Sequence, residues 1–276
     1  MFEILDAIKA FFLGIIEGVT EWLPVSSTGH MLIFDALFPM GVSAEFKEVF
    51  LCVIQLGAIC AVVLLFWNRM WPFQKREEGK PLVKKTVVIN WLKVALACVP
   101  GVIAEFLIGD LIPETPAVIA AMLILYGAVF IVLETWNAKR KPTTRKMNDI
   151  TWLTALEIGL FQILAVVPGT SRSGATIIGA LLLGVSRTAA VEFTFFLAVP
   201  VMLGMSGLKL VKYGFAFSGA EIAYLLIGVI VAFVVSLLVI RAMLNFIRKH
   251  NFKPFGYYRI ALGALILLLL AVGVLH

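Results

Sequence analysis

Two short polar segments hold most of the side chains in this chain that could do chemistry. The first, residues 24–30, reads PVSSTGH and follows Glu17 and Glu21. These two glutamates stand four residues apart, so on a helix they lie on one face. Two close carboxylates share a proton or hold a cation, unless a neighbouring Arg or Lys pairs with them for structure alone. We expect His30, beside two carboxylates and three hydroxyls, to be functional.

The second polar segment, residues 168–174, reads PGTSRSG and supplies positive charge. Its Arg172 is the only basic residue between positions 147 and 186. A guanidinium in such an apolar region needs an anion, which could be Glu17, Glu21 or a substrate phosphate. Arg suits phosphate because its planar fork donates two parallel hydrogen bonds. A purely structural role as the counter-charge of a glutamate remains the alternative.

The composition indicates the environment in which these segments act. Hydrophobic residues make up 61% of the 276 residues, charged residues only 14%, and the formal net charge is +6. Soluble domains are nearer 45–50% apolar and about 25% charged. These values exclude a soluble enzyme, a disordered chain and a nucleic-acid binder, so we expect no nucleic-acid partner. They indicate a polytopic all-α membrane protein, and long continuous apolar stretches argue against a barrel.

Apolar length predicts six transmembrane helices and two shorter hairpins. A span needs about 20 apolar residues. Two further apolar regions, 4–38 and 152–185, are each interrupted by one of the polar segments, which predicts re-entrant helical hairpins. The six predicted spans are 48–67, 87–110, 116–136, 190–211, 221–241 and 255–275.

Basic residues predict the orientation. Sixteen of the 23 Lys and Arg residues lie in segments 68–86, 137–149 and 241–259, which the positive-inside rule makes cytoplasmic. The parity of the spans then requires 152–185 to enter and leave on the cytoplasmic side. If 4–38 is also a hairpin, it enters from outside, and both termini are external.

An internal repeat agrees with this parity. An offset of 145 residues aligns Gly14 with Gly159, Glu17 with Gln162, Ser26 with Ser171 and Gly29 with Gly174. We therefore predict one integral membrane domain, 1–276, made of two inverted-topology repeats, 1–136 and 150–276. Each repeat is one hairpin plus three spans, and this odd number forces the inversion.

The two hairpins are predicted to meet at mid-depth and to form an anion site. The second half-helix of each hairpin begins near the membrane centre, and a helix N-terminus offers free N–H groups and partial positive charge. Hydroxyls, Arg172 and His30 converge there beside Glu17 and Glu21. A phosphate ester or diphosphate carried by a lipid fits this set of groups.

The two motifs resemble those of a known family. EGVTEWLPVSSTGH at 17–30 and PGTSRSGAT at 168–176 resemble the undecaprenyl-diphosphate phosphatase family, the bacitracin-resistance type of bacterial membrane phosphatase. The resemblance implies hydrolysis of undecaprenyl diphosphate to undecaprenyl phosphate and inorganic phosphate. That reaction recycles the lipid carrier for peptidoglycan synthesis and cell-wall biogenesis, with bacitracin resistance as a consequence. It also implies a multi-pass protein of the bacterial cell membrane, a site open to the cell exterior or periplasm, and a divalent cation, Mg²⁺ or Ca²⁺.

The resemblance also assigns residues. Glu17 and Glu21 match the acidic pair, which we expect to hold the cation. Ser27, His30 and Arg172 match residues assigned to catalysis. The positions expected to line the phosphate site are Ser26, Thr28, Ser171, Arg172, Ser173 and Thr176.

The nucleophile is left open by the sequence. Ser27, His30 and a water activated by His30 or the metal are the candidates, and we favour Ser27 with His30 as general base. The main alternative function is an inverted-repeat transporter or flippase for a lipid phosphate or small anion. An amphiphilic scaffold is a third reading, which leaves the buried Glu, His and Arg unexplained. A homodimer is plausible for such a fold, but no patch on the sequence supports it.

Overall fold

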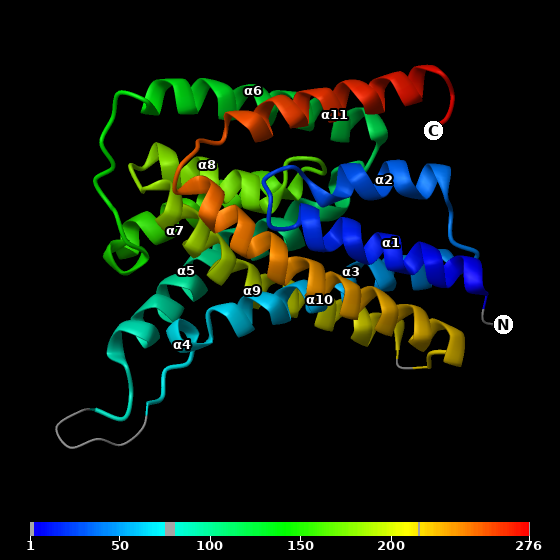
Figure 1. Ribbon diagram of the computed structural model, residues 1–276, viewed down its shortest axis with the longest axis horizontal. Coiled ribbons are helices and arrows are strands. Elements are labelled where there is room, and N and C mark those ends of the chain that lie inside the picture. Colours follow the sequence, from blue (N-terminus) through cyan, green and yellow to red (C-terminus); the bar gives the residue numbers. More distant parts are fainter. Residues whose placement is uncertain (1–2, 75–80, 215, 276) are drawn as a thin grey trace.

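The computed structural model of the chain is a bundle of helices (Figure 1). It describes residues 3–74, 81–214 and 216–275. Within these ranges, β pairing is limited to two isolated bridges. The α-helices are α1 (Ile4–Thr20), α2 (Ser27–Leu37), α3 (Ala44–Leu65), α4 (Trp67–Met70), α5 (Lys85–Ile108), α6 (Pro116–Asn137), α7 (Trp152–Gln162), α8 (Arg172–Leu182), α9 (Arg187–Tyr213), α10 (Gly219–Ile247) and α11 (Lys253–Ala271). Three short 3-10 helices are η1 (Gly109–Leu111), η2 (Met147–Asp149) and η3 (Ile163–Val166).

Six of these helices are long and apolar enough to cross a membrane: α3, α5, α6, α9, α10 and α11. They coincide with the six predicted spans, so the chain is a multi-pass membrane protein. The outer face of α10 shows the exposed apolar surface that is typical of a membrane-spanning helix. Large apolar side chains follow one another every four residues along one side of the helix and are about half exposed, which suits contact with lipid tails. They are Ile222, Leu226, Ile230, Val234 and Leu238.

Short hydroxyl residues begin most of the long helices. The first turn of a helix has N–H groups without intrahelical partners, and a side-chain oxygen at the N-cap accepts from one of them. Ser218 accepts from the backbone N–H of Glu221, and the Glu221 side chain in turn accepts from the Ser218 N–H. The N-caps that accept in the same way at α3, α6, α7 and α9 are Ser43, Thr115, Thr151 and Ser186.

Each of the regions 4–38 and 152–185 forms a pair of helices, α1–α2 and α7–α8, and the re-entrant course of these pairs in a membrane stays a prediction. Figure 1 shows that they lie at opposite ends of the bundle and that their turns face each other near the middle. The figure also places α4, η2 and the α10–α11 connection toward one end and both termini at the other. This separation is the one that the basic segments predicted. How these ends lie relative to a membrane, and the division into repeats 1–136 and 150–276, stay predictions.

Glycines hold each hairpin close to a long helix. A Cβ at Gly14 of α1 would lie 2.7 Å from the carbonyl oxygen of Gly228 on α10. A Cβ at Gly159 of α7, the position aligned by the 145-residue offset, would lie 2.4 Å from the carbonyl oxygen of Ala97 on α5. Neither space admits a side chain. The first helix of each hairpin is therefore fixed by backbone-to-backbone packing, which sets the place of the turn that follows.

Candidate active site

The two hairpin turns share an unusual backbone conformation at equivalent residues. Ser26 and Ser171 both have φ of 71°, and no other non-glycine residue of the described ranges has a positive φ. A side chain makes this left-handed region costly, so the surrounding structure must hold both serines there. Each serine is the N-cap of the second helix of its hairpin, α2 or α8. The strained turn thus directs two helix N-termini into the centre of the molecule.

Arg259 of α11 holds the two turns together. Its Nη1 donates to the carbonyl oxygen of Pro24 at 3.1 Å, and its Nη2 donates to those of Gly169 and Thr170 at 2.9 and 2.8 Å. The side chain is fully buried. One guanidinium therefore links the first turn to the second through main-chain oxygens, which a planar fork of five donors is suited to do.

The structure corrects the interpretation of Arg259 in the sequence. We counted it among the basic residues of segment 241–259, predicted to lie at the cytoplasmic face. It lies instead inside α11 between the two turns, because the turns present carbonyl oxygens that need donors. The signal was available: a charged residue within an apolar span is by default a functional residue.

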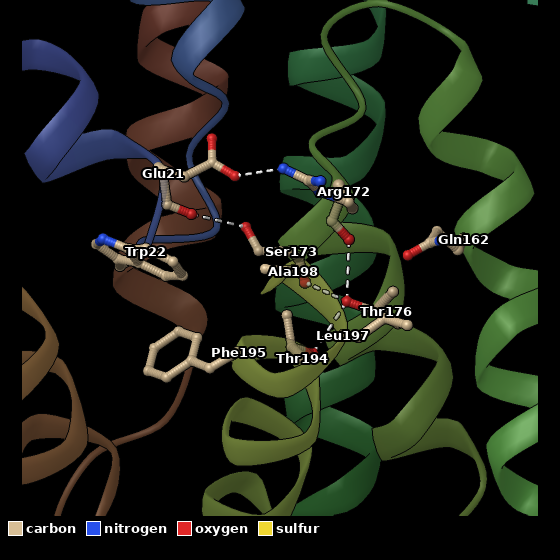
Figure 2. Close-up of a pocket in the computed structure, with 10 residues that line it drawn as sticks. All are labelled: Glu21, Trp22, Gln162, Arg172, Ser173, Thr176, Thr194, Phe195, Leu197 and Ala198. Carbon is tan, nitrogen blue, oxygen red and sulfur yellow. Dashed lines mark hydrogen bonds and ion pairs between the residues drawn. The ribbon is translucent and has the colours of Figure 1, made fainter. Parts of the chain in front are cut away.

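An ion pair joins the side chains of the two hairpins (Figure 2). Arg172 Nη2 lies 2.7 Å from Glu21 Oε1, and both side chains are largely shielded. The same glutamate accepts from Ser27 Oγ at 3.2 Å through its other oxygen, Oε2. Ser173 Oγ lies 3.4 Å from the Glu21 carbonyl oxygen and 3.1 Å from Ser171 Oγ. The anion that Arg172 required is therefore Glu21.

A small pocket of about 10 Å³, with room for about one water molecule, lies beside this ion pair. Figure 2 shows Glu21 and Trp22 on one side of it and Arg172, Ser173 and Thr176 on the other. The remaining lining residues are Gln162, Thr194, Phe195, Leu197 and Ala198. The pocket is thus polar around the ion pair and apolar around the rings of Trp22 and Phe195.

Thr176 lies at the bottom of the polar side. Its hydroxyl lies 2.9 Å from the Arg172 carbonyl oxygen and 3.0 Å from Thr194 Oγ1 on α9. These contacts tie the first turn of α8 to α9. Thr176 therefore lines this pocket and supports the helix turn that carries Arg172, while its contact with phosphate stays a prediction.

Glu17 is the least satisfied polar side chain of the site. It is fully buried, and neither carboxylate oxygen has a hydrogen-bond partner among the residues that the structure describes. Gln162, at the aligned position in the second hairpin, is also buried, and its Oε1 has no partner. A carboxylate buried without a donor is costly, and a cation is the natural partner for it.

The acidic pair fits a divalent cation. The described ranges contain no group of three or more His, Cys, Asp or Glu side chains that could hold a metal by themselves. Mg²⁺ is commonly bound by one or two carboxylates together with water and substrate phosphates. Glu17 and Glu21 match that donor set, because the remaining ligands would come from a phosphorylated substrate.

The side chain of His30 forms its hydrogen bonds with groups other than the ion pair. Its Nδ1 lies 2.7 Å from the Ser26 carbonyl oxygen, and its Nε2 lies 2.7 Å from the Tyr258 hydroxyl. Both ring nitrogens are thus engaged, and Ser27 donates to Glu21 instead. The structure brings Glu21, Ser27, Arg172, Ser171 and Ser173 into one connected network. His30 joins it only through the backbone of Ser26.

The remaining two predicted residues lie at the edge of the network. Thr28 is half-buried in the first turn of α2. Ser26 is buried, yet its hydroxyl has no partner. A serine at the N-cap commonly accepts from a first-turn N–H, but Ser26 makes no such bond in α2, whereas Ser171 accepts from the Gly174 N–H at 3.2 Å.

The chain is similar to proteins of known family throughout its length. The family described as "Bacitracin resistance protein BacA" matches residues 10–265. A protein of Enterococcus faecalis named undecaprenyl-diphosphatase is 56% identical over 98% of this chain and 99% of its own length. Proteins of the same name from Lachnoclostridium phytofermentans and Desulfitobacterium hafniense are 52% and 49% identical, each over 96% of this chain and 97% and 96% of their own lengths.

Proposed function

The chain belongs to the family of bacitracin resistance protein BacA, and we propose from this premise that it is an undecaprenyl-diphosphatase. It removes the terminal phosphate of undecaprenyl diphosphate and leaves undecaprenyl phosphate and inorganic phosphate. The observation that carries the proposal is the Glu21–Arg172 pair, which brings a phosphate-binding guanidinium from one hairpin to the carboxylate and hydroxyls of the other. The product serves again as lipid carrier for peptidoglycan synthesis, and bacitracin resistance follows from that recycling.

Phosphate binding is assigned to the groups around the two turns. The Glu21 contact uses one of the five N–H donors of the Arg172 guanidinium. The other donors and the N-terminus of α8 stabilise charge on the phosphoryl group as it is transferred. Ser26, Thr28, Ser171 and Ser173 supply hydroxyls; the free hydroxyl of Ser26 is the one most in need of such a ligand.

A divalent cation, Mg²⁺ or Ca²⁺, would be held by Glu17 and Glu21. When bound, it would offset the charge of the diphosphate and of the fully buried Glu17 carboxylate. Without it, two carboxylates beside a diphosphate repel the substrate.

Ser27 is our proposed nucleophile. Its Oγ attacks the terminal phosphorus, the bond from that phosphorus to the bridging oxygen breaks, and undecaprenyl phosphate leaves with the bond electrons. The hydroxyl proton goes to His30 Nε2, which stands one helical turn further along α2. His30 then gives this proton to the departing undecaprenyl phosphate. As base again, it accepts a proton from the water that hydrolyses the phosphoserine, which frees Ser27 and inorganic phosphate. Trapped phosphoenzyme tests this choice: phosphoserine supports it, and an acid-labile phosphohistidine would assign the attack to His30.

Phosphate release from undecaprenyl diphosphate by the purified protein in detergent tests the function itself. A phosphatase needs no second compartment, whereas a transporter or flippase produces no inorganic phosphate. We expect release that depends on protein concentration and is lost in Arg172→Ala. Absence of release by the folded wild-type protein, with divalent cation present, would contradict the proposal.

The proposed site opens to the cell exterior or periplasm of a bacterial cell membrane. The support is the separation of the basic segments from the two termini (Figure 1) and the positive-inside rule. Single cysteines placed within 142–146 or 249–253 should react with membrane-impermeant reagents only from the cytoplasmic side. Labelling of 142–146 from outside would overturn the inverted-repeat topology and the two re-entrant hairpins. Cross-linking in membranes tests the homodimer, which we keep as an expectation.

A further inference from the structure

Tyr258 of α11 contacts His30, the proposed general base, but has no role in the proposed mechanism. Its hydroxyl lies 2.7 Å from His30 Nε2, and the two rings are stacked with centroids 5.6 Å apart and planes 9° apart. Its neighbour Arg259 fixes the backbone of both turns. Two consecutive residues of α11 therefore contact the site, one through main-chain oxygens and one through His30.

The hydrogen bonds of His30 define which nitrogen carries the proton. The Ser26 carbonyl can only accept, so Nδ1 must be the protonated nitrogen facing it. In the neutral ring Nε2 then carries the lone pair, and the Tyr258 hydroxyl donates to it. The hydrogen bond from the Tyr258 hydroxyl therefore identifies Nε2 as the basic nitrogen of His30. The parallel stacking of the two rings fixes the plane of the imidazole.

The position of Tyr258 also allows it to be displaced. Its side chain is about half exposed, so it covers His30 on an accessible side rather than from within the core. Titratable residues close to the turns on elements packed against α2 are Glu17 of α1, Glu21 directly after α1, Tyr126 of α6, and Tyr258 and Arg259 of α11. Of these groups, only the Tyr258 hydroxyl forms a hydrogen bond with the imidazole in the described residues.

We propose that Tyr258 is the positioning residue of His30. In the free enzyme it holds the imidazole with Nε2 unprotonated and its plane fixed. When substrate binds, Ser27 Oγ replaces the phenol as the donor to Nε2. The inference deepens the proposed function and rests on the role of His30 in it. Correct orientation of a catalytic histidine by an outer partner is typically worth about 10- to 100-fold in activity.

The test compares Tyr258→Phe with Tyr257→Phe. The second change removes a hydroxyl from the adjacent residue, which is more exposed, and serves as the matched control. For Tyr258→Phe we expect kcat/KM for phosphate release to fall about 10-fold, the lower end of the loss seen for outer partners of metal-bound histidines, with kcat and the thermal denaturation midpoint unchanged. For Tyr257→Phe we expect no change. Equal kcat/KM in the two variants would overturn the proposal, and so would a loss explained by a lower thermal midpoint.

Nitrogen NMR gives a readout that does not depend on activity. The chain has three histidines, so His250→Gln with His276→Gln leaves His30 alone to be observed in detergent micelles. In Tyr258→Phe we expect the Nε2 resonance to move toward that of a nitrogen with a free lone pair, while Nδ1 stays protonated. An unmoved Nε2 resonance would overturn the contact. An inactive wild-type protein with the shift present would instead refute the proposed function alone.

Discussion

The two hairpins use one backbone design for opposite chemistry. α2 and α8 are both eleven residues long, and each begins directly after a serine at φ 71°. Where the first hairpin has Glu17, the second has Gln162. Where the second has Arg172, the first has Ser27. The repeated backbone supplies two converging helix N-termini, and the unlike side chains supply an acidic and a basic half.

The difference extends to how each turn is held. Ser171 caps α8 through the Gly174 N–H, while the Ser26 hydroxyl is buried without a partner. Among the described residues, both hairpins keep unpartnered buried side-chain groups: Ser26 and Glu17 in the first, Thr170 and Gln162 in the second. Because the first turn also lacks the serine cap and its unpartnered groups include a carboxyl, we infer that the first hairpin depends more on ligand to complete its bonding. The predictions below test this division.

The largest effect is expected at the basic half. Arg172→Lys keeps the charge but loses the fork, so activity should fall on the order of 10³-fold, as for other phosphate-stabilising arginines. The thermal midpoint should change little, because Lys can still pair with Glu21. Phosphate release by purified protein measures this, with the exposed Arg145→Lys as control. Near wild-type turnover would make Arg172 a structural counter-charge.

The second-largest loss of activity is expected at Arg259, which links the two hairpin turns. Arg259→Lys loses the bonds to one turn or the other, and a displacement of about 1 Å can cost about 10²-fold in rate. We expect that loss together with a lower thermal midpoint, since carbonyl oxygens are left buried without donors. Arg241→Lys, an exposed position on α10, is the control. Unchanged activity in Arg259→Lys would show that the turns keep their places without it.

The acidic half should differ from its counterpart in cation dependence. Glu17→Gln converts this position to the residue found in the second hairpin, and we expect the half-maximal divalent-cation concentration to rise about 10-fold. Gln162→Met should leave that concentration unchanged. Titrating phosphate release with Mg²⁺ and Ca²⁺ measures both. If Glu17→Gln and Glu21→Gln both keep the parent's cation dependence, the cation binds elsewhere.

The smallest effect separates the two turn serines. Ser171→Ala removes a helix cap and should lower the free energy of unfolding by about 1 kcal/mol. Ser26→Ala removes no cap, so its stability should match the parent while its substrate affinity falls. Thermal denaturation and KM, measured on both variants, check this. Equal destabilisation by the two changes would contradict the division.

The sequence was sufficient for the six spans and the positions of the two turns because these signals were local. Apolar length located all six spans, and a proline-containing polar segment within each of 4–38 and 152–185 located the turns. Arg172 was correctly expected to need an anion, since an isolated charge in an apolar stretch has few partners. Choosing Glu21 over Glu17 required the geometry of two hairpins packed against each other.

Other features depended on contacts between distant segments. Arg259 and Tyr258 lie more than 80 residues from the turns they contact, and no spacing rule links them. The positive-inside rule even misplaced Arg259, because charge counting treats every basic residue near a span end alike. The left-handed conformation of Ser26 and Ser171 could not be predicted either, because serine rarely adopts a positive φ, whereas a glycine at these positions would have suggested one.

The central claim is that both hairpins contribute to one phosphate site, and protection of two cysteines tests it most directly. A single protein carries Thr28→Cys and Ser173→Cys, with Cys52, Cys60 and Cys98 replaced by alanine. Each thiol's reaction rate is followed by mass spectrometry of labelled peptides while a non-hydrolysable diphosphate lipid analogue is titrated. Our account predicts that both thiols are protected with the same half-maximal analogue concentration. Protection of only one, or at clearly different concentrations, would contradict a shared site.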